Sequence, residues 1–168
     1  MKTIFKIKKW QLLKARGLEG KVTLPKGDFV AIGKRAFVGK QNRYMESVVL
    51  PEGVSVIKAE AFSGCENLEA VVIPESVTWI GQGAFENCAR LNEIIIPDSV
   101  NHIGNNAFSG CSALKSVQLS NQLSELSHEV FSGCTSLESI ALPDSIQEIS
   151  PDTFQGCSAL RTVTVGKS

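Results

Sequence analysis

The stretch AFSGCENLEAVVIP at residues 61–74 decides the fold, because the chain repeats it at a fixed interval. It returns as AFENCARLNEIIIP at 84–97 and as AFSGCSALKSVQLS at 107–120, so the period is 23 residues. Self-similarity with a period of about 20 to 50 residues is the sequence signature of repeat architectures. The sequence therefore predicts a solenoid of stacked coils.

Five core positions recur in the full units, which start at Val48, Val71, Ile94, Val117 and Ile140. The aromatic column consists of Phe62, Phe85, Phe108, Phe131 and Phe154, and the thiol column of Cys65, Cys88, Cys111, Cys134 and Cys157. The aliphatic columns are Leu68, Leu91, Leu114, Leu137 and Leu160; Leu50, Ile73, Ile96, Leu119 and Leu142; and Ile57, Ile80, Ile103, Leu126 and Ile149. Chance does not align five columns over five units, so we expect these side chains to face the interior.

Each unit has the pattern of one coil. The segment EAVVIP at 69–74 predicts a short strand, because it is β-branched and ends at a proline, which cannot donate to a ladder. We expect Val77 and Ile80 to turn inward across the coil. One turn position holds Gly in four units and Asn87 in the other, which indicates a left-handed backbone. Successive strands would pair in parallel, about 4.8 Å apart.

The chain before the first full unit contains a degenerate repeat and, ahead of it, a cap. Residues 22–47 keep Leu24 and Phe37 in register, but they are three residues longer and lack the Cys. Terminal units of solenoids are usually atypical, and residues 1–21, which alternate apolar residues with Lys, predict a short hairpin. We therefore expect an N-terminal cap at 1–21 and a solenoid at 22–168. Its coils start at residues 22, 48, 71, 94, 117 and 140, with a partial coil at 163.

The pattern L-x-x-V-x-I-P-x-S-V-x-x-I-G-x-x-A-F-x-x-C at residues 68–88 resembles the BspA-like, treponemal-type leucine-rich repeat. The resemblance covers about residues 22–168. It implies a leucine-rich-repeat solenoid of about six coils with an N-terminal β cap, built mainly from short parallel β-strands with turns or single helical turns. It also implies a surface or secreted binding protein, with adhesion to host proteins or other cells as the usual assignment. Because the first residues lack the uninterrupted apolar stretch of a signal peptide, we expect no export signal in this chain, and its location rests on the resemblance alone.

The five cysteines stand one per coil, each about one strand spacing from the next. Metal sites need several ligands that converge on one point, often with a C-x2–4-C step, and no such step is present. A disulfide between neighbouring coils is geometrically possible at about 5 Å, although five is an odd number and pairing would break the equivalence of the units. The spacing favours a buried structural column in which Cys65, Cys88, Cys111, Cys134 and Cys157 are weak donors to nearby carbonyls.

The sequence contains no recognisable catalytic constellation. His102 and His128 fall at different points of their units, and the HE at 128–129 lacks the second histidine of the H-E-x-x-H zinc motif. The GQG at 81–83 does not continue into a dinucleotide-binding fingerprint. Serines are frequent at the turns, but none has a partnered base in sequence. We therefore expect neither enzymatic activity nor a cofactor.

Candidate binding residues lie between the core positions. With Val71 and Ile73 inward, Val72 points outward by the alternation of a strand. We predict a partner-binding face that consists of Val49, Val72, Ile95, Gln118 and Ala141, the adjoining Glu69 and Glu93, and Trp79. An exposed apolar strip with a polar rim is typical of a binding site, although β-branched residues also simply suit an exposed strand. Trp79 would either anchor a partner or lie across a neighbouring coil.

Charge divides the chain unevenly. Residues 1–47 hold 12 Lys and Arg against 3 Asp and Glu, whereas residues 48–168 hold 5 against 14. The acidic part would repel phosphate, so we expect no nucleic acid, and no apolar run approaches the roughly 18 residues of a membrane span. We expect a non-catalytic module that binds a host or extracellular-matrix protein. The alternative is a structural protein that self-associates through its charge split and the uncapped VTVGKS at 163–168.

Overall fold

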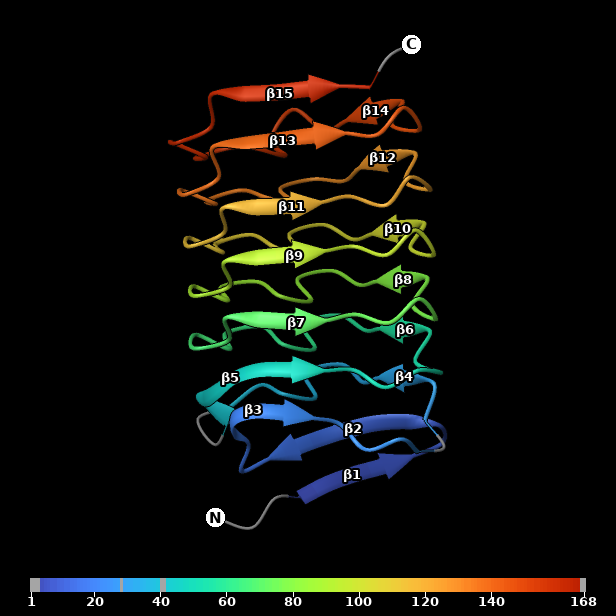
Figure 1. Ribbon diagram of the computed structural model, residues 1–168. Coiled ribbons are helices and arrows are strands. Elements are labelled where there is room, and N and C mark those ends of the chain that lie inside the picture. Colours follow the sequence, from blue (N-terminus) through green and yellow to red (C-terminus); the bar gives the residue numbers. More distant parts are fainter. Residues whose placement is uncertain (1–3, 28, 40–41, 167–168) are drawn as a thin grey trace.

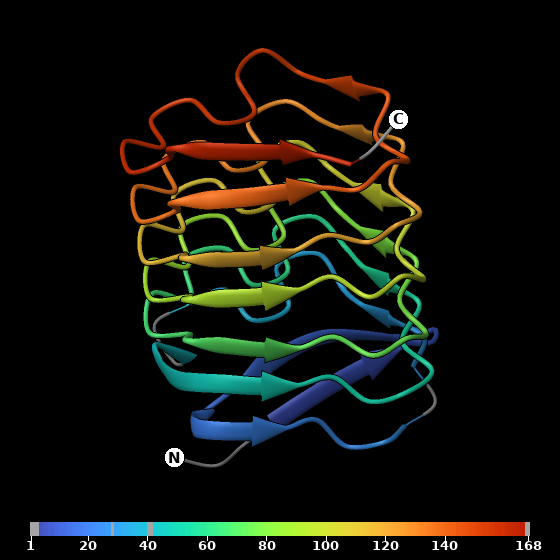
Figure 2. The same cartoon turned by 45° about the horizontal axis from the view of Figure 1, so that its top comes forward.

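The computed structural model describes residues 4–27, 29–39 and 42–166, which form a solenoid with almost no helix (Figure 1). The solenoid predicted from the 23-residue period is confirmed. In Figure 1 a front stack of strands faces the viewer, and a second stack lies to the right; Figure 2 shows the second stack behind the front one. Within the described residues, no helix has the length and apolar character needed to cross a membrane.

The front stack receives one strand from each coil. It consists of β3 (Glu19–Thr23), β5 (Tyr44–Val49), β7 (Ala70–Val72), β9 (Glu93–Ile95), β11 (Ser116–Gln118), β13 (Ser139–Leu142) and β15 (Thr162–Val165). The second stack consists of the two-residue strands β4 (Ala31–Ile32), β6 (Val56–Ile57), β8 (Trp79–Ile80), β10 (His102–Ile103), β12 (Glu125–Leu126) and β14 (Glu148–Ile149). The strand predicted within 69–74 is confirmed as β7, whereas the second strand of each coil was predicted only as inward-turning residues.

Neighbouring full units pair in parallel with residues 23 apart opposite each other, whereas the degenerate first coil pairs residues 25 or 26 apart with the next. Val49 of β5 lies opposite Val72 of β7, and Ile57 of β6 lies opposite Ile80 of β8. The register between full units therefore equals the sequence period. Because side chains alternate along a strand, a slip by one residue would turn the buried side chains outward.

An antiparallel hairpin precedes the first coil. Its strands are β1 (Ile4–Lys8) and β2 (Gln11–Arg16). Strand β2 also pairs in parallel with β4, with Leu12 opposite Ile32. The boundary expected at residue 22 falls inside β3, so the division into a cap and a solenoid remains a prediction. Through the pairing of β2 with β4, the hairpin extends the sheet of the second stack at its N-terminal end.

A ladder of phenylalanine rings runs through the core. Successive ring centroids are 4.3 to 5.9 Å apart, and successive planes differ by at most 16°. The rings belong to Phe37, Phe62, Phe85, Phe108, Phe131 and Phe154, of which all but Phe154 are fully buried. Because the spacing is close to the distance of about 4.8 Å between parallel strands, each ring stacks on its equivalent in the next coil.

A third line of contacts between coils runs along the turns. The Phe62 N–H donates to the Ala84 carbonyl and the Gly64 N–H to the Glu86 carbonyl, both at 2.8 Å. The Gly64 position has a φ of 69°, and its equivalent Asn87 has a φ of 58°. The predicted left-handed backbone at this turn is therefore confirmed, and it explains why Gly or Asn occupies the position.

Replacing a ring in the middle of the ladder tests how strongly the coils depend on it. We expect Phe108→Ala to lower the free energy of unfolding by about 3–5 kcal/mol, because the buried ring leaves a cavity between Phe85 and Phe131. Phe154→Ala, with a partly buried ring and one described aromatic neighbour, should cost less. Urea denaturation followed by circular dichroism measures both variants, and equal losses would contradict the expected dependence on burial.

Candidate functional site

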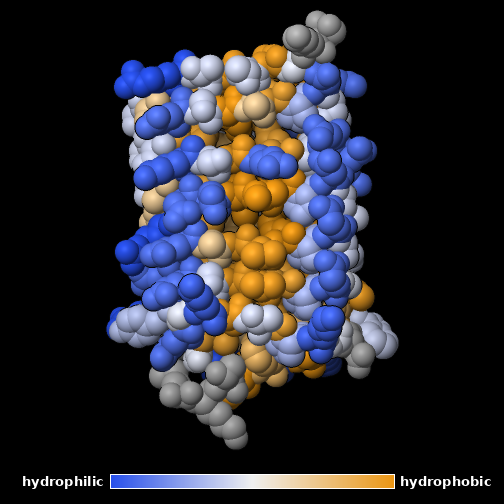
Figure 3. Space-filling model, viewed as in Figure 1, coloured by the Kyte–Doolittle hydropathy of each residue, from blue (hydrophilic) through white to orange (hydrophobic). Residues whose placement is uncertain are grey.

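A line of exposed apolar side chains runs along the front stack. Val49, Val72 and Ile95, which we call the front strip, are 37%, 55% and 60% exposed. In Figure 3 this face carries an apolar band that is bordered on both sides by hydrophilic side chains. Gln118 and Ala141 continue the line and are also exposed. The structure therefore brings together the five members of the predicted column, and its large apolar side chains are the first three.

Acidic side chains border the front strip on both sides. The acidic rims are Glu46, Glu69 and Glu93 at the N-terminal ends of the strands, and Glu52, Glu75 and Asp98 after the strands. Asn121 is the equivalent of Asp98 in the next coil, and it lines one hollow together with Gln118 and Ala141. The column of Glu52, Glu75 and Asp98 therefore lies beside the outward residues of the front stack. Of the rim residues, only Glu69 and Glu93 were predicted; the acidic residue that recurs after Pro51, Pro74 and Pro97 was the signal for the second rim.

Among the described residues, most of the rim carboxylates have no hydrogen-bond or ion-pair partner. Glu69 Oε1 lies 3.6 Å from Arg90 Nη2, and Asp98 accepts hydrogen bonds from the backbone N and side-chain Nδ2 of Asn121. Within the described part of the chain, no hydrogen bond or ion pair engages the side chains of the remaining four rim residues. These are Glu46, Glu52, Glu75 and Glu93.

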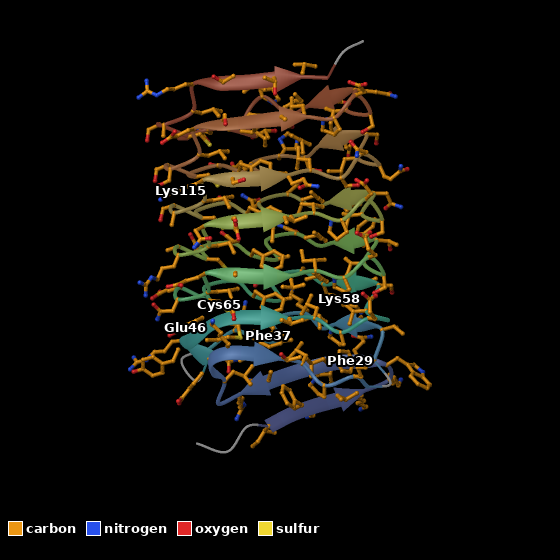
Figure 4. All side chains as sticks on the ribbon, viewed as in Figure 1. Phe29, Phe37, Glu46, Lys58, Cys65 and Lys115 are labelled. Carbon is orange, nitrogen blue, oxygen red and sulfur yellow. The ribbon has the colours of Figure 1, made fainter. Side chains whose placement is uncertain are left out.

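A hollow of about 370 Å³ lies over the first half of the front strip. Val49 and Val72 contribute to its floor, Glu46, Glu69 and Glu93 line it from the first rim, and Lys21 adds one positive charge to the lining. Figure 4 shows Glu46 at the edge of the front stack, away from the interior position of Phe37. The site is therefore an open apolar depression beside negative charge.

Trp79 lies apart from the front strip. It belongs to β8 in the second stack, and its ring stacks on that of His102 in the next coil, with centroids 3.6 Å apart. Burial lowers the pKa of His102, although the nearby Glu125 opposes this effect, so the neutral imidazole is favoured against the indole. Trp79 was predicted together with the front-strand candidates, but the structure places it on a different side of the coil, 44% exposed.

The cysteine thiols connect each coil to the preceding one. Cys88 Sγ donates to the Phe62 carbonyl at 3.3 Å, and the equivalent bonds of the other coils range from 3.1 to 3.8 Å. All five thiols are free, and Cys157 is the one that is only partly buried. Among the described residues, no group of three or more His, Cys, Asp or Glu side chains could hold a metal ion.

Asn42 takes the place of the missing thiol in the degenerate coil. Its side chain is buried, and Nδ2 donates to the carbonyls of Ala15 at 2.8 Å and Phe37 at 2.9 Å. The first of these bonds reaches the preceding turn of the chain, as the cysteine bonds do. Asn42 precedes Cys65 by 23 residues, and this spacing is the signal by which the sequence could have revealed it.

The buried thiols make stability depend on alkaline pH. Burial raises the pKa of Cys65 and Cys111 from 9.0 to about 12, so the unfolded chain loses these protons first as pH rises. This contribution to stability is fully present below pH 9.0, and it is lost progressively as pH rises towards about 12. Urea titrations under reducing conditions at pH values on both sides of 9.0 should therefore show a falling free energy of unfolding.

The control for this prediction is the double variant Cys65→Ala and Cys111→Ala. Because it removes two of the groups that ionise, its stability should fall less steeply over the same pH range. An identical pH dependence in the variant and the parent chain would contradict the assignment to these thiols.

The sequence matches a model of the BspA-type leucine-rich repeat region, in six copies over residues 22–161. No curated protein matches it. The matched residues contain the front strip, the acidic rims and all five cysteines of the thiol column.

Several solved bacterial structures share the architecture. The T. pallidum leucine-rich repeat protein is 37% identical over 70% of this chain, with a TM-score of 0.66, and the match spans 57% of that protein. A leucine-rich cell surface protein from Faecalibacterium prausnitzii is 25% identical over 90% of this chain and 60% of its own, with a TM-score of 0.56. The pneumococcal vaccine antigen PcpA shares the fold, with a TM-score of 0.78 at 22% identity over 99% of this chain and 48% of its own. The chain thus spans about half the length of the structures it matches.

Proposed function

Because the chain belongs to the BspA-type leucine-rich repeat family, we propose that it is a non-catalytic module that binds a protein partner on the front strip. The observation that carries this proposal is the row of Val49, Val72 and Ile95, exposed in three successive coils between two polar borders. Apolar side chains gathered on one exposed face mark interaction sites in soluble proteins. An apolar centre with a polar rim is also the usual anatomy of a protein interface.

The partner that we propose is a host or extracellular-matrix protein, so that the module acts in adhesion at a cell surface. The family consists of bacterial cell-surface repeat proteins, and one similar structure is described as a leucine-rich cell surface protein. Leucine-rich repeat domains generally mediate protein interactions, and they are typically non-catalytic. Both properties support a binding role in preference to an enzymatic one.

Charged replacements in the front strip test this proposal. We expect the triple variant Val49→Asp, Val72→Asp and Ile95→Asp to lose binding to immobilised extracellular-matrix proteins in surface plasmon resonance, because the buried part of the interface would then hold unpaired charge. Ala141→Asp, in the same column but outside the apolar part, is the control and should bind as the parent does. Unchanged binding of the triple variant to every matrix protein tested would contradict the proposal.

Self-association is a second candidate function, and the uneven distribution of charge along the chain favours it. Val163 and Val165 of β15 are 42% and 73% exposed, and Ile149 of β14 is 40% exposed. β15 pairs with β13 along one edge, and no other strand pairs with it among the described residues. The basic first quarter of the sequence would attract the acidic remainder of a second copy.

Light scattering over a range of protein concentrations tests self-association. We expect the mass to rise with concentration, and the double variant Val163→Lys and Val165→Lys to stay monomeric, because charges on the apolar strand oppose its burial. A parent chain whose mass is that of a monomer at every concentration contradicts this second proposal and leaves the first untouched.

A further inference from the structure

We infer that the partner segment that docks on the front strip is a cationic amphipathic α-helix, which lies along the solenoid axis with Lys or Arg on both flanks of its apolar face. The inference rests on the proposed function, since it takes the front strip as the binding site. Beyond the proposed function, it specifies the charge of the bound segment, its helical conformation and its orientation along the solenoid axis.

The carboxylates and the apolar residues alternate in the same order in three successive coils. The order is Glu46, Val49 and Glu52 in the first, Glu69, Val72 and Glu75 in the second, and Glu93, Ile95 and Asp98 in the third. The next coil breaks it with Lys115, Gln118 and Asn121. Glu46 and Lys115 lie along the same edge of the front stack in Figure 4. Their column carries Glu69 and the neutral Asn92 between them, and Glu93 supplies the third carboxylate from the next position along the strand. Carboxylates therefore flank the apolar residue on both sides in each coil of the front strip, while Glu138 and Asp144 carry negative charge beyond it.

Most of the rim carboxylates lack a side-chain partner in the described part of the chain. Glu46 and Glu69 occupy neighbouring coils in register, because the Glu69 N–H donates to the Glu46 carbonyl at 2.7 Å. Like charges side by side on adjacent strands destabilise a sheet. Four of the six rim carboxylates have no side-chain partner within the described residues, so a cationic partner would relieve this repulsion and gain complementary contacts.

The spacing of the front strip fits a helix that crosses the coils. Adjacent strands are about 4.8 Å apart, so the outward residues of three coils span about 10 Å. Residues i, i+3 or i+4, and i+7 of an α-helix lie on one face, at about 5–6 Å from one to the next and about 10.5 Å in total. An extended segment repeats its side chains on one face at about 6.6 Å and falls out of step within three coils.

The width of the site fits the same element. Glu46 and Glu52 are six residues apart along the chain, so their Cα atoms are separated by at most about 20 Å. A helix with its side chains is about 10–12 Å across. It fills the space over the strip, and flexible Lys or Arg side chains on both flanks reach the two rims.

The arrangement also disfavours other partners. A segment cannot join the front stack as an added strand at β7, because β7 pairs with β5 and lies between β5 and β9. Nucleic acid and anionic membrane surfaces would be repelled by the two rows of carboxylates. A helix with acidic flanks would meet the same repulsion, and this difference in charge supplies the first test.

The probe is a synthetic helix of about 14 residues, with Leu along one face and Lys on both flanks. Fluorescence anisotropy should detect its binding to the intact chain, and the affinity should fall as salt is raised from about 50 to about 500 mM, because salt screens the rims. Two comparison peptides, one with Glu in place of Lys and one with the same composition in scrambled order, should each bind at least about tenfold more weakly. If either binds as well as the probe, the inference is overturned.

Charge reversal on the chain locates the contact. We expect Glu75→Lys with Glu93→Lys, one change on each rim, to weaken binding of the Lys probe by about tenfold or more. The matched control is Glu125→Lys with Glu148→Lys, which alters the net charge equally on exposed residues of the second stack and should leave binding unchanged. Equal effects of the two pairs would show attraction to the overall charge and would overturn the inference.

Failure of the inference can be distinguished from failure of the proposed function. If the Lys probe does not bind, while the triple Asp variant of the front strip still loses binding to a matrix protein, the strip is a binding site for a partner of other chemistry. If the triple variant loses nothing, the proposed site itself is wrong, and a probe bound elsewhere cannot support a helix on the strip. Thermal unfolding of every variant confirms that each one retains the folded solenoid.

Discussion

The register between coils is the constraint on which the rest of the structure depends. Each coil donates backbone hydrogen bonds to its neighbours from the front stack, the second stack and the turns. In the full units the strands of both stacks pair residues 23 apart, and the turn bonds join residues 22 apart, such as Phe62 and Ala84. An inserted residue would break the register of whatever follows it. The columns of Phe, Cys and aliphatic residues follow from this constraint, because equivalent positions must fill equivalent space against their own copies.

The sequence predicted the coil well because every full unit repeats the same interior. The Phe column and the left-handed turn at Asn87 could be assigned from the period alone. The period does not indicate which columns lie side by side, since that depends on where the coil bends. Trp79 was therefore grouped with strand residues from which the bend before β8 separates it, and the residues after the prolines were not recognised as a second rim.

The same constraint leaves the surface free to vary. Inward positions are occupied by copies of one another, whereas outward positions change from Val72 to Ile95 to Gln118 without altering the register. A coil can therefore carry any side chain on its front face that suits a strand. The front strip and its rims are a local pattern of this kind, confined to three coils, and they concern recognition more than folding.

The thiol bonds of the solenoid always point the same way along the chain. Each cysteine donates to a carbonyl of the coil before it, while the Phe N–H of that earlier coil reaches forward to a carbonyl of the later one. A duplicated unit thus arrives with both the donor and the acceptor that its predecessor requires. Duplication of a unit within the gene can lengthen such an array by whole coils without altering any junction. The size of a binding face can therefore change in steps of one coil.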